Sequence, residues 1–222
     1  MFKKVLSTTV LSVSVLGAMA ANAAAPGVYI TGQVGYANTH MGNKTDFSGF
    51  VDHPASKDKN ISNNGLAGRV ALGYQFNQNF AVEAGYLQLG EKKVNVGAIP
   101  VTPSSLSEGK LKLQQNAIDL VGKGIIPVAN NINVYGKLGV AYVNTRIQGI
   151  LQTPGQPTIT ADLNDKANVA KHKWAPEAAV GVSYDITPNM SLDTSWTHIQ
   201  PLGNDKPGNI DFVAVGLGYN FG

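Results

Sequence analysis

Apolar and polar residues alternate with a period of two along most of this chain after residue 25. Eight segments show the alternation: 27–37, 65–76, 80–89, 115–126, 132–145, 174–186, 190–198 and 210–221. Such alternation is typical of β-strands that separate two different environments. Each segment has roughly 9 to 14 residues, enough to cross the hydrocarbon core of a membrane at a tilt of about 45°.

The two faces of these segments differ in residue size as well as polarity. In the last segment, Val213, Val215, Leu217, Tyr219 and Phe221 lie opposite Ala214, Gly216, Gly218 and Asn220. A soluble barrel keeps its large apolar residues inside. In these segments we expect the face of small and polar residues to point inward and the large apolar residues to point outward, which is the inverse arrangement. Eight strands leave an interior only wide enough for packed side chains, which suits small inward residues.

The connections between the segments alternate in length. Short turns are expected at 77–79, 127–131 and 185–189, and long polar connections at 38–64, 90–113, 146–173 and 199–209. Outer-membrane barrels have short periplasmic turns and longer extracellular loops. The sequence therefore predicts an all-β fold, an eight-stranded antiparallel up-and-down transmembrane β-barrel, whose closure pairs every backbone group in lipid.

The N-terminus has the layout of a secretory signal peptide. Lys3 and Lys4 precede a mostly apolar stretch at 5–20, and small-residue cleavage sites follow at 21–25. We therefore expect a signal peptide at 1–24 and the barrel at 25–222. Without Lys3 and Lys4, 15 of the 17 basic residues remain beside 14 acidic ones, so the net charge falls from +3 to +1 and no nucleic-acid partner is expected.

Several strand sequences resemble the OmpA-type outer-membrane β-barrel domain. The clearest stretch is 174–222, which contains AVGVSYDITP at 179–188, SWT at 195–197 and the ending VGLGYNF at 215–221. The resemblance implies insertion by the barrel-assembly machinery, with an assembly signal formed by Leu217, Tyr219 and Phe221. Gly222 departs from the family's terminal phenylalanine. No periplasmic peptidoglycan-binding domain is expected after the barrel, so cell-wall tethering is not carried over.

Charged residues fall on the inward face predicted by the alternation. They are Arg69, Glu83, Asp119, Lys123, Lys137, Glu177 and Asp193. In the family such residues form a salt-bridge plug; Glu83 and Lys123 match its positions, whereas Ser183 and Ser191 stand where other charges are found. Because an unpaired charge in a narrow interior is costly, we expect ion pairs among the first five residues. Both a packing role and a gated small pore remain open.

Aromatic residues cluster at the ends of the segments on the outward face. We expect an interfacial girdle, as membrane barrels have, formed by Tyr36, Tyr74, Phe76, Tyr86, Tyr142, Trp174, Tyr184 and Trp196. The alternative, ordinary core aromatics, would place them in mid-strand facing inward.

Other chemistry has weak support in the sequence. His40 and His53 with Asp46 or Asp52 match no metal-ligand spacing, and we expect neither metal nor cofactor. Ser195, His198 and Asp205 lie near the predicted outer rim, but no GxSxG motif is present and a triad depends on geometry. We therefore expect no enzymatic activity.

The long loops hold most of the surface charge, with an excess of lysine in 90–113 and 146–173. These lysines suit the phosphates of lipopolysaccharide, and the resemblance makes a host-cell receptor, adhesion and virulence plausible. The expected function is that of a structural and surface-interaction protein in the outer membrane of a Gram-negative bacterium. The alternative is a small pore or transport conduit.

Overall fold

The computed structural model describes residues 26–41, 64–102, 105–165 and 167–222, with backbone alone at 94–102 and 105–108. The expected signal peptide lies outside the described residues. The same holds for His53, Asp46 and Asp52, which lie between residues 41 and 64. The described chain forms ten strands: β1 Gly27–Asn38, β2 Gly65–Asn77, β3 Phe80–Leu89, β4 Lys92–Thr102, β5 Ser105–Ala129, β6 Ile132–Gln152, β7 Ile159–Asp162, β8 His172–Asp185, β9 Met190–Ile199 and β10 Ile210–Asn220.

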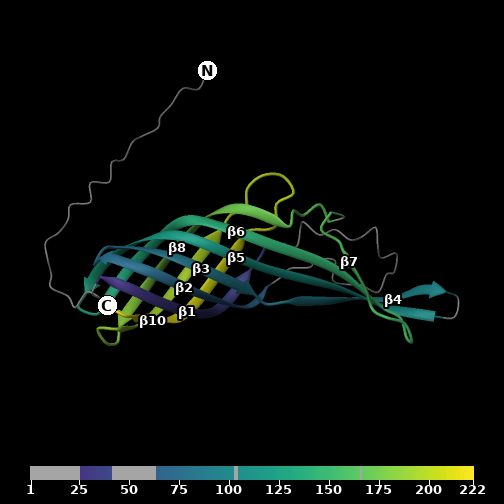
Figure 1. The fold of residues 1–222 in the computed structure, drawn as a ribbon, viewed down its shortest axis with the longest axis horizontal. Helices are drawn as coiled ribbons and strands as arrows, with labels where there is room; N and C mark the ends of the chain where they lie inside the picture. Colours follow the sequence, from purple (N-terminus) through teal and green to yellow (C-terminus); the bar gives the residue numbers. More distant parts are fainter. Residues whose placement is uncertain (1–25, 42–63, 103–104, 166) are drawn as a thin grey trace, which may run out of the picture.

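Eight of these strands close into a ring. The order β5-β3-β2-β1-β10-β9-β8-β6 is completed by the pairing of β5 with β6, and every pairing in it is antiparallel (Figure 1). β1 and β10 meet along ten residue pairs, among them Val34 with Val215. The predicted eight-stranded up-and-down barrel is confirmed. Among the described residues there is no helix of the length and apolarity needed to cross a bilayer.

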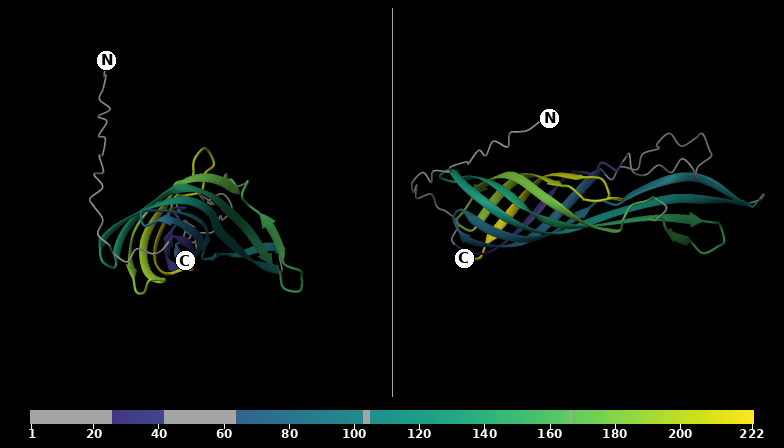
Figure 2. Two further views of the ribbon diagram at one scale, coloured as in Figure 1. Left: turned by 60° about the vertical axis from the view of Figure 1, so that its left-hand side comes forward. Right: turned by 90° about the horizontal axis from the view of Figure 1, so that it is seen from above.

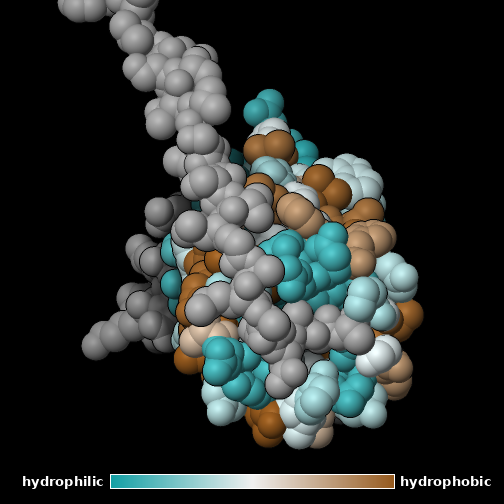
Figure 3. All heavy atoms as spheres, turned by 90° about the vertical axis from the view of Figure 1, so that its left-hand side faces the viewer, coloured by the Kyte–Doolittle hydropathy of each residue, from teal (hydrophilic) through white to brown (hydrophobic). Residues whose placement is uncertain are grey.

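Side chains alternate between the wall and the interior as the sequence predicts. Along β10, Val213, Val215 and Leu217 are exposed on the outside, and Phe212 and Ala214 are buried inside. Figure 3 looks onto the end that holds the short turns: hydrophobic residues gather along its outline, with hydrophilic residues nearer the middle. The exposed apolar wall is the surface that meets lipid.

The predicted girdle residues all lie on the outer wall at its two ends. Tyr74, Phe76 and Tyr184 lie towards the turns, and Tyr36, Tyr86, Tyr142, Trp174 and Trp196 lie towards the long connections. Within the second group, the Tyr142 and Trp174 ring centroids are 5.1 Å apart. Both groups lie at the ends of the apolar wall, where interfacial aromatic residues of membrane barrels are found.

Two of the long connections contain strands as well as loops, which the sequence did not predict: most of 90–113 and part of 146–173 are strand. β5 has 25 residues and β6 has 21, although about 9 to 11 suffice to cross a bilayer. Their surplus continues outside the barrel as a sheet with β4 and β7 (Figures 1 and 2). The prediction followed polar composition, which a water-exposed strand shares with a loop. We call β4, β7 and the outer parts of β5 and β6 the extracellular sheet.

Candidate functional site

The interior of the barrel contains a charged layer centred on Glu83. This side chain has no exposed surface and lies on β3. Its carboxylate accepts hydrogen bonds from Lys137 Nζ at 2.6 Å, the Tyr29 hydroxyl at 2.8 Å and Arg69 Nη1 at 3.3 Å. Lys123 Nζ lies 3.5 Å from the same carboxylate. Side chains from four strands therefore contact one carboxylate. These contacts compensate the cost of burying its charge.

The remaining predicted lumen residues surround this centre. Asp119 accepts two hydrogen bonds from Arg69, at 2.5 and 3.0 Å. Asp193 is held by neutral donors, with Tyr135 Oη at 3.0 Å and Gln33 Nε2 at 3.1 Å. The structure thus brings Arg69, Glu83, Asp119, Lys123 and Lys137 together, as expected, and places Asp193 beside them in a neutral network.

Glu177 is the exception within the layer. It is 4% exposed, and its Oε2 has no hydrogen-bond partner within the described part of the chain. The seven predicted residues carry three positive and four negative formal charges. The basic residues pair with Glu83 and Asp119, and Glu177 differs from Asp193 in having a buried oxygen without a hydrogen bond.

Two inward tyrosines fill the barrel beside the charged layer, and the sequence did not single them out. Tyr29 lies opposite Gly73, and Tyr135 lies opposite Gly181, in paired positions of neighbouring strands. A Cβ on either glycine would overlap the facing tyrosine ring. Lys123 Nζ also lies 4.4 Å from the centroid of the Tyr135 ring. The inward glycines thus make room for the rings that narrow the lumen.

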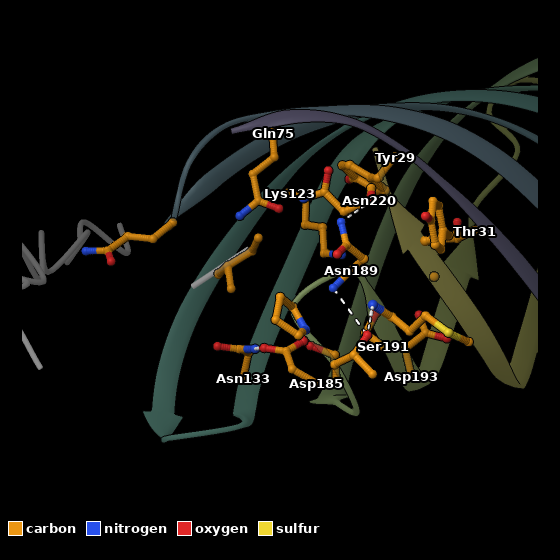
Figure 4. A pocket seen from close by; sticks show the side chains of 18 residues that line it. Tyr29, Thr31, Gln75, Lys123, Asn133, Asp185, Asn189, Ser191, Asp193 and Asn220 are labelled. Atoms are coloured by element: carbon orange, nitrogen blue, oxygen red, sulfur yellow. Dashed lines mark hydrogen bonds between the residues drawn. The ribbon is translucent and has the colours of Figure 1, made fainter. Parts of the chain in front are cut away.

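A polar cavity opens from the charged layer towards the short turns. Its volume is about 70 Å³, and Figure 4 shows Lys123 and Tyr29 at one side with Asn133, Asp185 and Ser191 at the other. At about 10–15 Å³ of accessible volume for each water molecule, it has room for roughly five. The cavity is a shallow periplasmic vestibule that reaches Lys123.

An apolar layer closes the lumen on the extracellular side of the charges. In β5, Ala117 follows Asp119 in that direction, and in β6, Ala141 and Val143 come after Lys137. The layer is one cluster of buried residues: Ala37, Ala67, Leu87, Leu89, Ala117, Ala141, Val143, Ala175, Ile199, Ile210, Phe212 and Ala214. At this height the lumen is lined by apolar side chains, in contrast to the charged layer below it.

A second apolar cluster covers the extracellular mouth. It consists of Met41, Leu113, Ile147 and Val169, with Leu111, Leu163 and Ala167 packed against it. The buried Asn164 ties the covering segment to the wall: its Oδ1 accepts from Ile147 N at 2.9 Å, and its Nδ2 donates to Thr145 O at 2.9 Å and Val169 O at 3.1 Å. We call the described residues of this segment, 163–165 and 167–170, the lid.

The residues considered for catalysis do not converge. Ser195 faces the lumen and accepts a hydrogen bond from Gln33 at 3.1 Å, whereas His198 lies on the other face of β9 and contacts Asp211 at 2.7 Å. His40 also approaches Asp211, at 3.5 Å. No group of three or more potential metal ligands occurs among the described residues.

The lysines of the long connections lie mainly on the extracellular sheet. Glu91 pairs with Lys112 at 2.8 Å and with Lys93 at 3.0 Å. Hydrogen bonds from these two ammonium groups hold the pKa of Glu91 below its usual value. Lys171 pairs with Asp162 at 2.7 Å.

The strand ring, the outward girdles and the buried charges agree with a comparison of sequences. Residues 23–222 match the family model described as the OmpA-like transmembrane domain. The chain belongs to this family. It is therefore an outer-membrane β-barrel protein of a Gram-negative bacterium.

Individual relatives of the barrel extend this picture. A Coxiella burnetii protein described as uncharacterized is 32% identical over 218 residues, 90% of this chain and 87% of the relative. Outer membrane protein A of Serratia marcescens is 26% identical over 180 residues, 79% of this chain and 43% of the relative. The chain thus spans less than half of the Serratia protein.

A solved structure shares the fold. The crystal structure of Neisserial surface protein A has a TM-score of 0.53 and 14% sequence identity, and the match covers 87% of this chain and 97% of that one. Identity this low shows common architecture alone. The role of the lumen and of the extracellular sheet has to be argued from this chain's own residues.

Proposed function

We propose that the protein is a sealed outer-membrane anchor that displays an extracellular sheet and loops for contact with lipopolysaccharide or a host surface. The observation that carries the proposal is the double closure of the extracellular end. The apolar layer fills the lumen above the charges, and the lid covers the mouth with a second apolar cluster. The proposal includes no catalytic step, and Ser195 and His198, the residues considered for one, point to opposite sides of the wall.

The extracellular sheet supports the display part of the proposal. β5 and β6 run without interruption from the barrel into this sheet and share 21 residue pairs. Continuous backbone pairing makes the sheet a stiff extension of the wall rather than a flexible loop. A surface of this kind presents its side chains in fixed positions, which favours specific contact with a partner.

A small pore or conduit is the second candidate, favoured by the vestibule that reaches Lys123. Planar-bilayer recording with the full mature chain separates the two. We expect no channel events over a range of voltages. A variant with Leu87→Ser and Phe212→Ser, which makes the apolar layer polar, should raise water and ion leakage, and Val213→Ser on the lipid-facing wall should not. Conductance by the unmodified chain would refute the sealed anchor.

Attachment assays test the surface contact. Removing 93–112 and joining Lys92 to Leu113 through a two-residue turn would delete most of the β4–β5 hairpin at a position where the two strands already pair. We expect bacteria with the shortened protein to lose attachment to host cells or to change their lipopolysaccharide contacts. If both properties are unchanged at equal surface level, the sheet has no contact role.

A further inference from the structure

The register of the wall locates the upper limit of the lipid-facing surface. Tyr86, Ile118, Tyr142 and Trp174 pair in sequence across β3, β5, β6 and β8 and form one outward row. The next outward row towards the extracellular end is Gln88, Asn116, Asn144 and His172. The wall changes from apolar and aromatic to polar within this single step. The membrane boundary on this side of the barrel lies between the two rows.

Basic residues occupy the outward rows above the boundary. Arg146 pairs with Gln114, Lys112 lies between Lys93 and Gln148, and Lys110 pairs with Ile150. We call Lys93, Lys110, Lys112 and Arg146 the basic face. The other side of the same strands carries Leu111, Leu113 and Ile147, which pack beneath the lid. The basic face is therefore the side of these strands that is turned away from the lid.

The height of these residues matches the polar layer outside the lipid chains. Arg146 is four residues beyond Tyr142, or about 14 Å along the strand at about 3.4 Å per residue. With a tilt of about 40°, it lies about 10 Å above the boundary row. Lys112, six residues beyond Ile118, lies about 15 Å above it by the same reasoning. The interfacial zone is about 5–8 Å deep on each side, so Arg146 lies a few ångströms above it and Lys112 lies well above it.

The basic face has a surplus of positive charge. Of its four basic side chains, Lys93 and Lys112 share Glu91, and Lys110 donates to Gln152 at 2.7 Å. Asp162, which pairs with Lys171, lies beside Gln148 on β7. Arg146 is exposed and has no ion pair with any described residue. Arginine binds phosphate through two parallel hydrogen bonds, and neighbouring lysines add charge. The surface therefore suits a phosphorylated ligand.

We propose that the basic face binds the phosphate groups on the core sugars of lipopolysaccharide molecules that pack against the barrel wall. The inference rests on the proposed function, of which it names one partner and its site. The face continues the lipid-facing wall upward, so the molecules beside it are anchored in the outer leaflet. A soluble partner approaching from above would meet the tip of the sheet and the lid before this side surface.

Binding to lipopolysaccharide can be measured with the full mature chain in lipid vesicles. The probe is purified lipopolysaccharide titrated into phosphatidylcholine vesicles, with dephosphorylated lipopolysaccharide and phosphatidylglycerol as separate arms. We expect Arg146→Gln with Lys112→Gln to weaken binding at least tenfold and to reduce its salt dependence. The matched control, Lys92→Gln with Lys206→Gln, removes the same charge away from the face and should bind normally.

Three results would overturn this proposal: unchanged binding in the double variant, equal binding of dephosphorylated lipopolysaccharide, or equal binding of phosphatidylglycerol. The first would remove the site, and the other two would remove the core phosphate as its ligand. None of these results affects the proposal of a sealed anchor, which is tested by the conductance measurement. A conducting barrel that still bound lipopolysaccharide through Arg146 would refute the proposed function and leave the binding site in place.

Discussion

Arg69 donates two hydrogen bonds to Asp119, from Nη2 at 2.5 Å and from Nε at 3.0 Å, and joins β2 to β5 through the interior of the barrel. These two strands are separated in the wall by β3. The same guanidinium also reaches Glu83 on β3, at 3.3 Å. One basic side chain thus cross-links three strands and satisfies two buried acids.

Removing Arg69 should destabilise the barrel strongly. Arg69→Met leaves Asp119 without its cation in a narrow interior, and breaking a buried pair in this way costs about 3–5 kcal/mol. Adding Asp119→Leu removes the stranded charge, so the double variant should regain much of that loss. Urea unfolding in lipid vesicles, followed by the fluorescence of Trp174 and Trp196, measures the stability of the single and the double variant. The control is Val70→Ala on the lipid-facing side of β2; a single variant no less stable than this control would contradict the cross-link.

Adding a methyl group to Gly73 should disturb the same layer from β2, the strand that also carries Arg69. The new Cβ would meet the ring of Tyr29, whose hydroxyl donates to Glu83 at 2.8 Å. We expect Gly73→Ala to lower the free energy of unfolding by about 1–3 kcal/mol, as overpacking does. Gly32→Ala is the matched control, because nothing lies within 4 Å of its added Cβ. The glycine pairing would be unimportant if the two variants unfolded at the same urea concentration.

The sequence predicted the barrel well because alternation is a local property. Each of the eight wall strands, the direction of Arg69 and Glu83, and the outward girdles follow from position within a strand. The contacts between inward residues do not follow from position within a strand, because they depend on the register between strands. The pairing of Tyr29 with Gly73 and of Arg69 with Asp119 required the structure for this reason.

The closure of the extracellular end was missed for a related reason. Leu87 and Phe212 occupy inward positions, but apolar residues there look the same in the sequence whether they seal a lumen or end a strand. The extracellular sheet was missed because Lys110, Lys112 and their neighbours are as polar as a loop. Continued alternation beyond the membrane-spanning length, as at Leu111, Leu113 and Ile147, was the available signal.

Placing a charge on the lipid-facing wall should be costly. Leu138 is 73% exposed and lies on β6 between the two girdles. Leu138→Arg puts a guanidinium near the middle of the bilayer, where such a substitution costs about 2–4 kcal/mol. Leu202→Arg, in the connection after β9, should change stability little. Equal stability of the two variants in vesicles would mean that this wall does not face lipid.

The end of β10 is where the proposed assembly signal lies. Tyr219 and Phe221 are exposed on the outer wall at the turn end, with ring centroids 5.0 Å apart and nearly perpendicular planes. A signal read by the assembly machinery acts before the strand closes on β1, so its loss should slow insertion without weakening the finished barrel. We expect Phe221→Ala to lower the amount of protein in the outer membrane severalfold, and to leave urea unfolding of the refolded protein nearly unchanged.

Phe80→Ala separates this effect from a general loss of aromatic surface. Phe80 is 62% exposed at the same end of the barrel, against 64% for Phe221, but lies on β3, away from the closing strand. Its removal should leave outer-membrane levels close to normal. If Phe80→Ala and Phe221→Ala reduced the level equally, the phenylalanine would act as an interfacial aromatic and the signal would have to lie elsewhere in the chain.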